Sequence, residues 1–576
     1  MVEQNVHGSL SRRRFFGAAA ATAVAAAVAG SQWTPAAAAP VGEASLTVPP
    51  EFPGGIDLYQ QSYVNWSKEI VFDHVWTCAP RGEGEVVTLT NWAAKHGYTL
   101  RARGSMHGWS PLTVVPGYPA DKVVLLDTTA HLVGVNVDPT GSPATVTAQG
   151  GASLLSILTA LEGHGLGWSS IPAIGDITIG GALAIDAHGA TPPADGESAV
   201  PGTSFGTVSN LVTALTAVVW DDSSREYVAR VFNRSDPAIR PLLTHLGRTF
   251  ITSVTLQAGA DKRLRCHSTF DVGWQELFAP AGSPGRTFEK YLAESGSVEA
   301  IWFPFTQEPW LKIWSDEPNR PAQSREVTGP YNYAFSDLLP EPLTDGLGVA
   351  ATQLAAGTPA FGASQLSAVK AGMAFTGTGD IWGTSKNVRL YLRATTLRVT
   401  AGGGVVLARR SDVATIIHDM ASWLDERLTH YSSLGQYPVN GPFEVRLCGL
   451  DNDADVAVES SGPPSLSAVS PVPGHPEWDT AIWLNVVSFP GTPGMHAFFR
   501  EMELWMHGHY SGSLGTMRPE YSKGWAFTND RSHADTEFLT RTLPSRYPEW
   551  ESASAAFDEF DPRRIFRNPF LDKVMP

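Results

Sequence analysis

The sequence contains very little cysteine. Only Cys78, Cys266 and Cys448 occur among 576 residues, and they lie far apart, outside any CxxC pair. Such a sparse and odd-numbered set excludes a disulfide-rich scaffold and a zinc site built from cysteines.

Positive charge is outnumbered: 41 lysines and arginines face 57 aspartates and glutamates, which gives a formal net charge of −16. This balance opposes binding to a phosphate backbone, so we expect no nucleic-acid partner. Beyond the N-terminal segment, no run is long and apolar enough to span a bilayer. The length and the 43% hydrophobic content predict a globular protein of two or three domains.

Residues 1–40 have the pattern of an export signal. Three arginines between Ser11 and Phe16 precede an alanine-rich run, and small residues suited to cleavage follow between Thr34 and Pro40. Paired arginines before phenylalanines are typical of the twin-arginine route, with an ordinary secretory signal as the alternative. We therefore expect a secreted protein, which the twin-arginine route would export already folded.

Two glycine-rich stretches, Arg103–Pro111 and Pro172–Gly181, are candidates for holding phosphate through backbone N–H groups. Neither contains a Walker lysine, and no GxGxxG follows a strand, which argues against the P-loop and simple dinucleotide folds. The first stretch carries His107, whose neutral imidazole is a competent nucleophile. Together they predict a phosphate-containing cofactor with a covalent tether, against the alternative of a turn histidine bonded to backbone.

The first half resembles the FAD domain of the vanillyl-alcohol-oxidase flavoprotein family. The resemblance rests on these runs: Arg103–Trp109, Gly150–Leu154, Pro172–Gly189, Phe205–Val208 and Gly247–Leu256. It implies a two-part FAD-binding domain over 41–262, in which the two loops hold the pyrophosphate and His107 bonds covalently to the flavin. Thr249 and Phe250 depart from the family pattern, in which glycine is common.

The resemblance also implies which residues contact FAD. They lie in the first loop, in the second loop and in the segments after it. They are Arg103, Gly104, Ser105, Met106, His107, Gly108, Trp109, Ser110, Pro172, Gly175, Asp176, Thr178, Ile179, Gly181, Ala182, His188, Gly189, Gly206, Val208 and Ile251. For His188, a core histidine bonded to backbone is the alternative.

The second half is similar to the sterol-oxidising members that carry covalent FAD. The runs are Glu299–Thr306, Gly329–Tyr333, Asn440–Asp451, Ala481–Asn485 and Tyr521–Trp525. The resemblance implies oxidation of a 3β-hydroxysterol such as cholesterol to the 3-ketone, isomerisation of the 5-ene to the 4-ene, and reduction of O₂ to H₂O₂. The implied partners are sterol, oxygen and, transiently, a lipid surface that delivers sterol; no stable protein partner is evident.

Residues 263–530 are expected to form an α+β substrate-binding cap domain with a large antiparallel sheet covered by helices, and 531–576 to return to the FAD domain. Separate strand-like runs alternate with helix-like runs, which favours helices on one face of the sheet. The strand-like runs are Val298–Thr306, Val388–Arg393, Phe443–Cys448 and Ala481–Val486; the helix-like runs are Val413–Leu428 and His496–His507.

Glu444 and Arg446 are two residues apart on a predicted strand, so both side chains point to the same face. If that face is buried, each charge needs a partner, and Glu299 on another strand is the natural third member. Either glutamate would take the substrate's hydroxyl proton, provided burial raises its pKa. Asn485 would hydrogen-bond the hydroxyl or the glutamate. The alternative is a Glu–Arg pair that faces solvent.

Large aromatic side chains are expected to line a sterol cavity, with ordinary core packing as the alternative. They are Trp302, Phe303, Phe305, Trp310, Phe361, Phe375, Trp382 and Trp483.

Three other functions are considered. A sugar-alcohol or aldonolactone oxidase would share the fold, and Arg518–Lys523 is somewhat like a motif of those enzymes. A serine hydrolase is suggested by the GxSxG of Gly202–Gly206, but that elbow needs a preceding strand and a following helix. A non-catalytic binding protein would be colourless.

Overall fold

The computed structural model describes residues 46–194, 196–333, 346, 348–349, 352–353, 355–392, 397–458 and 461–576. The expected export signal and Arg393, the last residue of one predicted strand, lie outside these ranges. The described residues form three sheets, of four, six and nine strands. None of the described helices is long and apolar enough to cross a membrane.

The four-stranded sheet, in the order β1-β2-β4-β3, leads the chain into the first glycine-rich loop. Its strands are β1 (Leu58–Val64), β2 (Val71–Cys78), β3 (Thr99–Arg103) and β4 (Val123–Asp127). Helix α2 (Glu83–His96) buries Leu89 and Trp92 in the same core as Leu100 of β3. Because β3 ends at Arg103, the loop that follows begins at the edge of a rigid element.

The six-stranded sheet packs against α4 (Leu154–Glu162) and α5 (Ile179–Ala184), which flank the second glycine-rich loop. Its strands are β5 (Val135–Asp138), β6 (Ala144–Gln149), β7 (Leu166–Gly167), β8 (Val212–Asp221), β9 (Glu226–Asn233) and β10 (Phe250–Ala260). Short helix α3 (Thr128–His131) joins the two sheets in sequence.

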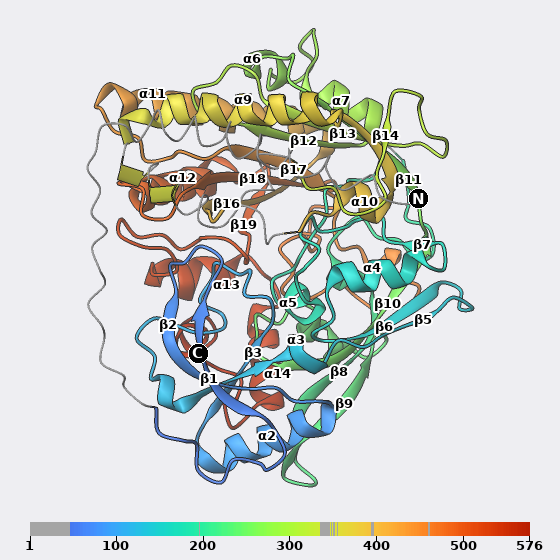
Figure 1. The fold of residues 1–576 in the computed structure, drawn as a ribbon, viewed down its shortest axis with the longest axis vertical. Helices are drawn as coiled ribbons and strands as arrows, with labels where there is room; N and C mark the ends of the chain where they lie inside the picture. The colour runs from blue at the N-terminus through green and yellow to red at the C-terminus, as the bar shows by residue number, and fades with distance from the viewer. Residues whose placement is uncertain are drawn as a thin grey trace, which may run out of the picture.

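The nine-stranded sheet lies above these two in Figure 1 and is antiparallel except where the short β14 pairs with β15. Its strands are β11 (Arg263–Thr269), β12 (Ser297–Trp302), β13 (Trp310–Asp316), β14 (Arg325–Glu326), β15 (Asp380–Thr384), β16 (Thr400–Ala408), β17 (Phe443–Cys448), β18 (Thr480–Ser488) and β19 (Thr516–Pro519). The expected large antiparallel sheet with helices is confirmed.

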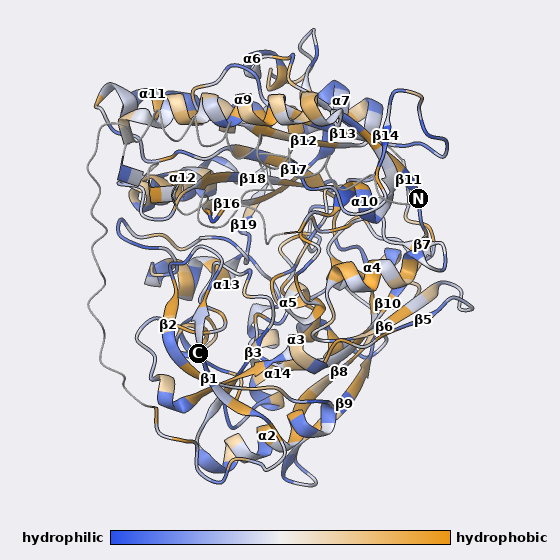
Figure 2. Cartoon of the chain, in the orientation of Figure 1, coloured by the Kyte–Doolittle hydropathy of each residue, from blue (hydrophilic) through white to orange (hydrophobic). Residues whose placement is uncertain are grey.

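The faces of this sheet have different partners because side chains alternate along each strand. On one face Ala300, Val445 and Leu484 share a core with α7 (Phe288–Ser295), α11 (Val413–Ser433) and α12 (Met495–His509). Figure 2 shows apolar residues along these strands and along the helices that run over them. Helix α9 (Thr358–Thr376) instead contributes to a core with Ile301 and Trp310, whose side chains belong to the opposite face. The expectation that helices cover one face only is therefore wrong.

The strand expected at Val388–Arg393 is also wrong. Val388 and Arg389 belong to α10 (Ser385–Arg389), and Tyr391 makes only an isolated bridge to Ile174. The sheet position is occupied by β15, directly before α10, so the chain leaves the sheet there.

The C-terminal segment packs with the first half of the chain. Helices α14 (Trp550–Phe560) and α15 (Pro569–Val574) place Phe557 and Phe570 in the core of the six-stranded sheet. In Figure 1 the C-terminus lies among the elements of the first half. Buried Arg101 of β3 donates to the carbonyls of Gly247 and Phe566, which ties this segment to the base of the first loop.

The stretch 191–206, which contains the GxSxG motif, is buried over its last five residues. Asp451, just after β17, accepts hydrogen bonds from Thr207 N at 2.6 Å and Thr207 Oγ1 at 2.7 Å. Ser204 is buried and its hydroxyl accepts from Asn210 Nδ2 at 3.1 Å. A 3₁₀ turn and then β8 follow, so the helix that a nucleophile elbow needs is missing here.

We expect Gly206→Ala to weaken the contact between the first half and the nine-stranded sheet. A Cβ at this position would lie 2.1 Å from Asp451 Oδ1 and 2.8 Å from Leu450 O. The clash should lower the free energy of unfolding by about 1–3 kcal/mol, measured by urea denaturation. Gly84→Ala is the matched control: Gly84 is exposed in α2 with nothing within 4 Å of such a Cβ, so stability should stay equal or rise. An unchanged midpoint for Gly206→Ala would contradict this packing.

Candidate functional site

The two glycine-rich loops touch each other. A Cβ on Gly104 would lie 2.5 Å from the hydroxyl oxygen of Thr178, the residue that caps α5 by accepting from Gly181 N at 3.3 Å. Only glycine allows the backbone of the first loop to approach that closely. The two stretches expected to hold phosphate are therefore adjacent in space.

The second loop is fixed by backbone hydrogen bonds to its surroundings. Gly175 N donates to Tyr391 O at 2.9 Å, and Gly180 N donates to Gly150 O at 2.9 Å. Asp176 lies within this stretch, and Ala182, which directly follows it in α5, is buried in the core of the six-stranded sheet. The loop is thus held on both sides, by the first half and by the chain after α10.

The first loop docks on the segment after β19. Trp109 N donates to Ser522 O at 3.1 Å, and Ser110 Oγ donates to Lys523 O at 3.1 Å. At the start of the loop, Arg103 pairs with Asp127 at 2.7 Å. Nothing lies within 4 Å of the place where a Cβ on Gly108 would be, so there is room beside the loop at this point. Bare backbone, neighbouring space and two converging loops fit a bound phosphate-containing cofactor.

His107 lies between two aromatic rings. Its ring centroid is 4.6 Å from that of Trp66 and 5.5 Å from that of Trp109. The preceding residue, Met106, has φ 57°, a left-handed conformation in which non-glycine residues are uncommon. This turn and the two rings fix the direction of the imidazole, so the histidine is oriented before any ligand arrives.

His188 does not lie at the first loop but against the nine-stranded sheet. Its ring stacks on Trp483 with centroids 3.7 Å apart and 2° between the planes. Its Nδ1 is 3.0 Å from Gly189 O, and its Nε2 is 3.8 Å from a carboxylate oxygen of Glu520. His188 was expected either to contact the flavin or to bond to backbone. The structure shows the backbone contact, and Glu520 is an additional carboxylate partner.

The remaining residues that were expected to contact the cofactor differ in what surrounds them. Gly189 packs on Ser170 and Ile171, and Gly206 packs on Asp451, so both glycines serve close backbone packing. Val208 is fully buried, and Ile251 of β10 is almost so. Thr249, where the family favours glycine, is buried and its hydroxyl has no hydrogen-bond partner among the described residues.

A row of alternating charges crosses the sheet face opposite α11 and α12. The register places Lys312 of β13 beside Glu299 of β12, and Glu299 beside Arg446 of β17. Glu299 accepts from Arg446 Nε at 2.6 Å and from Lys312 Nζ at 3.2 Å. Arg446 Nη1 donates to Glu444 at 3.0 Å, and Glu444 lies 3.9 Å from Lys523 Nζ. Glu299 is buried, the side chains of Lys312, Arg446 and Glu444 are at most 18% exposed, and each charge has a counter-charge, so the solvent-facing alternative does not hold.

A glutamate that takes the hydroxyl proton was expected to have a pKa raised by burial, and Glu299 does not meet this condition. Burial raises the pKa of this carboxyl, but the charges of Lys312 and Arg446 outweigh burial and lower the pKa to about 2. For Arg446, burial lowers the pKa, but the carboxylates of Glu444 and Glu299 raise it by more. The guanidinium therefore stays protonated. Glu299 is therefore a fixed anion and a poor proton acceptor at neutral pH.

Asn485 lies opposite Glu444 across the β17–β18 pair but does not bond to it. Its Nδ2 donates to Glu520 at 2.9 Å, and its buried Oδ1 has no partner among the described residues. An acceptor oxygen held in this way suits a ligand hydroxyl. Gly403 faces it on β16 with φ 140°, and a Cβ there would lie 2.8 Å from that oxygen.

Three charged residues of the site were missed from the sequence. Glu520 and Lys523 lie in the loop after β19, and Lys312 lies on β13. Burial raises the pKa of Glu520, but Lys523 and then His188 lower it below its ordinary range. A signal existed for the first two, since Arg518–Lys523 attracted attention as a motif; Lys312 had none beyond its place in an aromatic run.

An apolar cluster adjoins this charged row. Ile301, the cross-strand neighbour of Glu444, packs with Trp310 and Phe303 and with Leu366 and Met373 of α9. Of the aromatics expected to line a cavity, Phe303 and Trp310 belong here. Trp302 lies in the core on the face covered by α7, α11 and α12, and Phe375 is 58% exposed, so these two do not fit the expectation, whereas Trp483 lies opposite Arg446 and stacks on His188.

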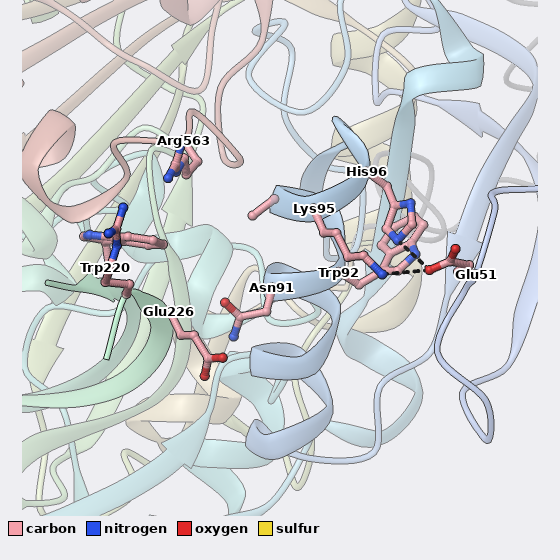
Figure 3. A pocket seen from close by; sticks show the side chains of 10 residues that line it. Glu51, Asn91, Trp92, Lys95, His96, Trp220, Glu226 and Arg563 are labelled. Atoms are coloured by element: carbon pink, nitrogen blue, oxygen red, sulfur yellow. Dashed lines mark hydrogen bonds and ion pairs between the residues drawn. The ribbon is translucent and has the colours of Figure 1, made fainter. Parts of the chain in front are cut away.

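A separate surface hollow of about 630 Å³ lies on α2, at the end of the molecule remote from the nine-stranded sheet (Figures 1 and 3). Trp92, Trp220 and Arg563 line it, and Lys95 pairs with Glu51 at its rim at 2.7 Å. None of the residues discussed above for cofactor or substrate contributes to it. Among the described residues, no group of three or more side chains could hold a metal ion.

Comparison with known proteins identifies relatives of both halves. The sequence family described as "Cholesterol oxidase, substrate-binding" matches residues 263–576, and "FAD binding domain" matches 76–200. The cholesterol oxidase from Brevibacterium sterolicum, and a histidine-to-alanine variant of it, are each 51% identical with a TM-score of 0.90. A solvent-stable cholesterol oxidase is 47% identical with the same TM-score. Each covers 92% of this chain and 100% of its own. No curated protein sequence matched.

We expect Glu299→Gln to destabilise the protein in a pH-dependent way, because it leaves two buried cations without their shared anion. The loss at pH 7 should be about 3 kcal/mol. The folded-state pKa of about 2 lies below the ordinary value of 4.5, so this stabilisation is complete above pH 4.5 and disappears as the pH falls towards 2. Urea unfolding at pH 7 and pH 3.5 should therefore show a shrinking difference from the wild type. Glu326→Gln, which removes an exposed pair with Arg320, should change little at either pH; a pH-independent loss for Glu299→Gln would refute the assignment.

Proposed function

This chain belongs to the family of FAD-dependent cholesterol oxidases, and we propose that it oxidises the 3β-hydroxyl of sterols on the sheet face that carries Glu299, Glu444 and Arg446. As a member of this family it is an FAD-dependent oxidoreductase that acts on a CH–OH group of a sterol. The observation that supports the location is the contact between this charged row and the apolar cluster around Ile301 and Trp310. A sterol has one hydroxyl on an otherwise apolar skeleton, and this face offers both environments side by side.

The two loops are proposed to hold FAD. Their contact at Gly104 and Thr178, the open space beside Gly108 and the oriented His107 support this assignment. Bound FAD supplies the acceptor for the hydride that leaves the alcohol carbon. Attachment through His107 would keep the cofactor on the enzyme after export.

The remaining chemistry is assigned to the chain's own residues. On binding, the sterol hydroxyl would donate its hydrogen bond to Asn485 Oδ1, and in the reacting orientation it would turn to Glu444. The Arg446 guanidinium would polarise the oxygen as negative charge develops on it. Glu299 is bound by the cations Lys312 and Arg446, and Glu520 is bound by Asn485 with Lys523 at 3.7 Å and His188 at 3.8 Å. Glu444 has one close cation, Arg446, and a second at 3.9 Å, so we assign it the hydroxyl proton.

The full conversion to the 4-en-3-one requires a proton to leave C4 and another to be added at C6. Glu444, opposite Ile301 of the apolar cluster, would first pass the hydroxyl proton on to the reduction of oxygen, and its carboxylate would then take the C4 proton and return it at C6. The final electron acceptor is molecular oxygen, which is released as hydrogen peroxide.

Export and lipid contact complete the proposal. The arginines and the alanine-rich run of residues 1–40 support secretion by the twin-arginine route. Sterols reside in lipid, so the enzyme must meet a lipid surface transiently. Phe375, which is exposed on the helix that covers the apolar cluster, supports contact at this end of α9.

A sugar oxidase on the same fold is the alternative, and the motif that suggested it has another use here. Arg518 is buried and donates to the carbonyl oxygens of Ser467, Ala468 and Ser470 at 2.7–3.3 Å, so its guanidinium is occupied by backbone. The neighbouring cluster around α9 is apolar, whereas a polyol needs a hydrogen-bonding partner for nearly every carbon.

Peroxide release with cholesterol and with xylitol separates the two substrates. We expect cholesterol to be oxidised at least about 100-fold more efficiently, because a buried apolar cluster offers no partners for the extra hydroxyls. The ketone product, followed by its ultraviolet absorption, should appear as the conjugated 4-ene. Equal rates with xylitol would overturn the sterol proposal, and a non-conjugated product would overturn the isomerisation.

Acid precipitation tests the tether. The wild-type pellet should stay yellow, whereas His107→Ala should release its flavin into the supernatant because the bond to the ring is lost. His131→Ala, an exposed histidine of α3, serves as the control and should behave as the wild type. Flavin that remains in the pellet of His107→Ala would show that another residue forms the bond.

A further inference from the structure

Lys312 is a largely enclosed cation that none of the proposed chemical steps uses. Its side chain is only 13% exposed, and its ammonium lies 3.2 Å from Glu299, on the side away from Arg446. Glu299 thus lies between two cations, one on each neighbouring strand. Because neither strand can move without breaking the sheet, the carboxylate is held at both oxygens.

Three aromatic rings surround the ammonium. The nitrogen lies 4.9 Å from the ring centroid of Trp310, 5.1 Å from that of Tyr333 and 5.4 Å from that of Trp314. Ring faces attract a cation and exclude water, so both the rings and Glu299 favour the protonated form. Trp310 is itself fixed by donation from its Nε1 to Ser268 at 3.0 Å.

The other polar groups near this pair do not compete for Glu299. Arg389 donates to Ser297 at 3.2 Å and stacks over Trp314. Burial raises the pKa of the Cys266 thiol to about 11, so it is neutral at physiological pH. Glu444 contacts Arg446 and Lys523, not Lys312.

Building on the function proposed above, we propose that Lys312 is a positioning residue for sterol oxidation: it anchors Glu299 from behind, and Glu299 in turn holds Arg446 towards the substrate. Arg446 donates to Glu299 through Nε at 2.6 Å and to Glu444 through Nη1 at 3.0 Å. Without the Lys312 contact, the Glu299 carboxylate could move together with the Arg446 guanidinium, and the guanidinium would no longer be held in one orientation. In this arrangement Lys312 acts on Arg446 through Glu299.

A double-mutant cycle between Lys312→Met and Glu299→Gln tests this chain of contacts. Methionine has a similar length and packs well against aromatic rings, so the cage stays filled while the charge is lost. Lys312→Met should lower kcat with cholesterol by about tenfold or more with a smaller change in KM, and Lys312→Arg should recover most of it. In a Glu299→Gln background, Lys312→Met should add less than about a twofold loss.

A matched control removes a lysine ion pair at the end of β13, outside the charged row. Lys262, just before β11, pairs with Asp316 at 2.6 Å and both side chains are about half exposed, so Lys262→Met should leave kcat unchanged. Losses from Lys312→Met and Glu299→Gln that multiply independently would overturn the proposal, as would full activity of Lys312→Met.

A readout without turnover separates this proposal from the sterol assignment. Thermal unfolding of the same four proteins should show the same coupling, and the wild-type advantage over Lys312→Met should shrink as the pH falls from 5 towards 2 and Glu299 becomes protonated. If the wild type fails to oxidise sterols, the proposed function falls, while the unfolding cycle still decides whether Lys312 anchors Glu299. Additive unfolding losses would refute the anchoring itself.

Discussion

Buried charge on one face of the nine-stranded sheet is the constraint on which the candidate site depends. A charge removed from water needs a counter-charge close by, and strand alternation places Lys312, Glu299, Arg446 and Glu444 where each meets an opposite sign. The opposite face of the same strands is apolar and packs on α11 and α12. The sheet therefore has an apolar core on one face and the charged row, where the proposed reaction takes place, on the other.

The loop after β19 links this face to the first of the two loops proposed to hold FAD. It carries Glu520 and Lys523 into the charged row, and its backbone accepts hydrogen bonds from Trp109 and Ser110 of the first loop. Glu503 of α12 fixes the next turn by accepting from Ala526 N at 2.7 Å and Phe527 N at 2.9 Å. The segment after β19 thus sets the position of both the first loop and the charges. In this way the two halves of the chain can contribute to one site.

Local patterns in the sequence were sufficient for much of this arrangement. Alternation along Phe443–Cys448 places Glu444 and Arg446 on one face, and the structure brings both of them together with Glu299. Patterns failed where a distant partner decides the outcome. Lys312 looks like any lysine among aromatics until β12 and β13 pair, and the low pKa of Glu299 follows from two cations on different strands. Likewise, Val388 has a strand-like neighbourhood but lies in α10, because β15 already occupies that place in the sheet.

The sequence by itself determined the class of protein: its glycine-rich loops, His107 and the later runs indicate the flavoprotein family, because backbone close approach and strand alternation are local properties that residue types express directly. Only the tertiary structure decided which charges meet. It placed Glu520 beside Asn485, stacked His188 on Trp483, and put α9 over the site face. The reason is physical: electrostatic contacts depend on distances across the sheet and between domains, and these distances exist only after the chain has folded.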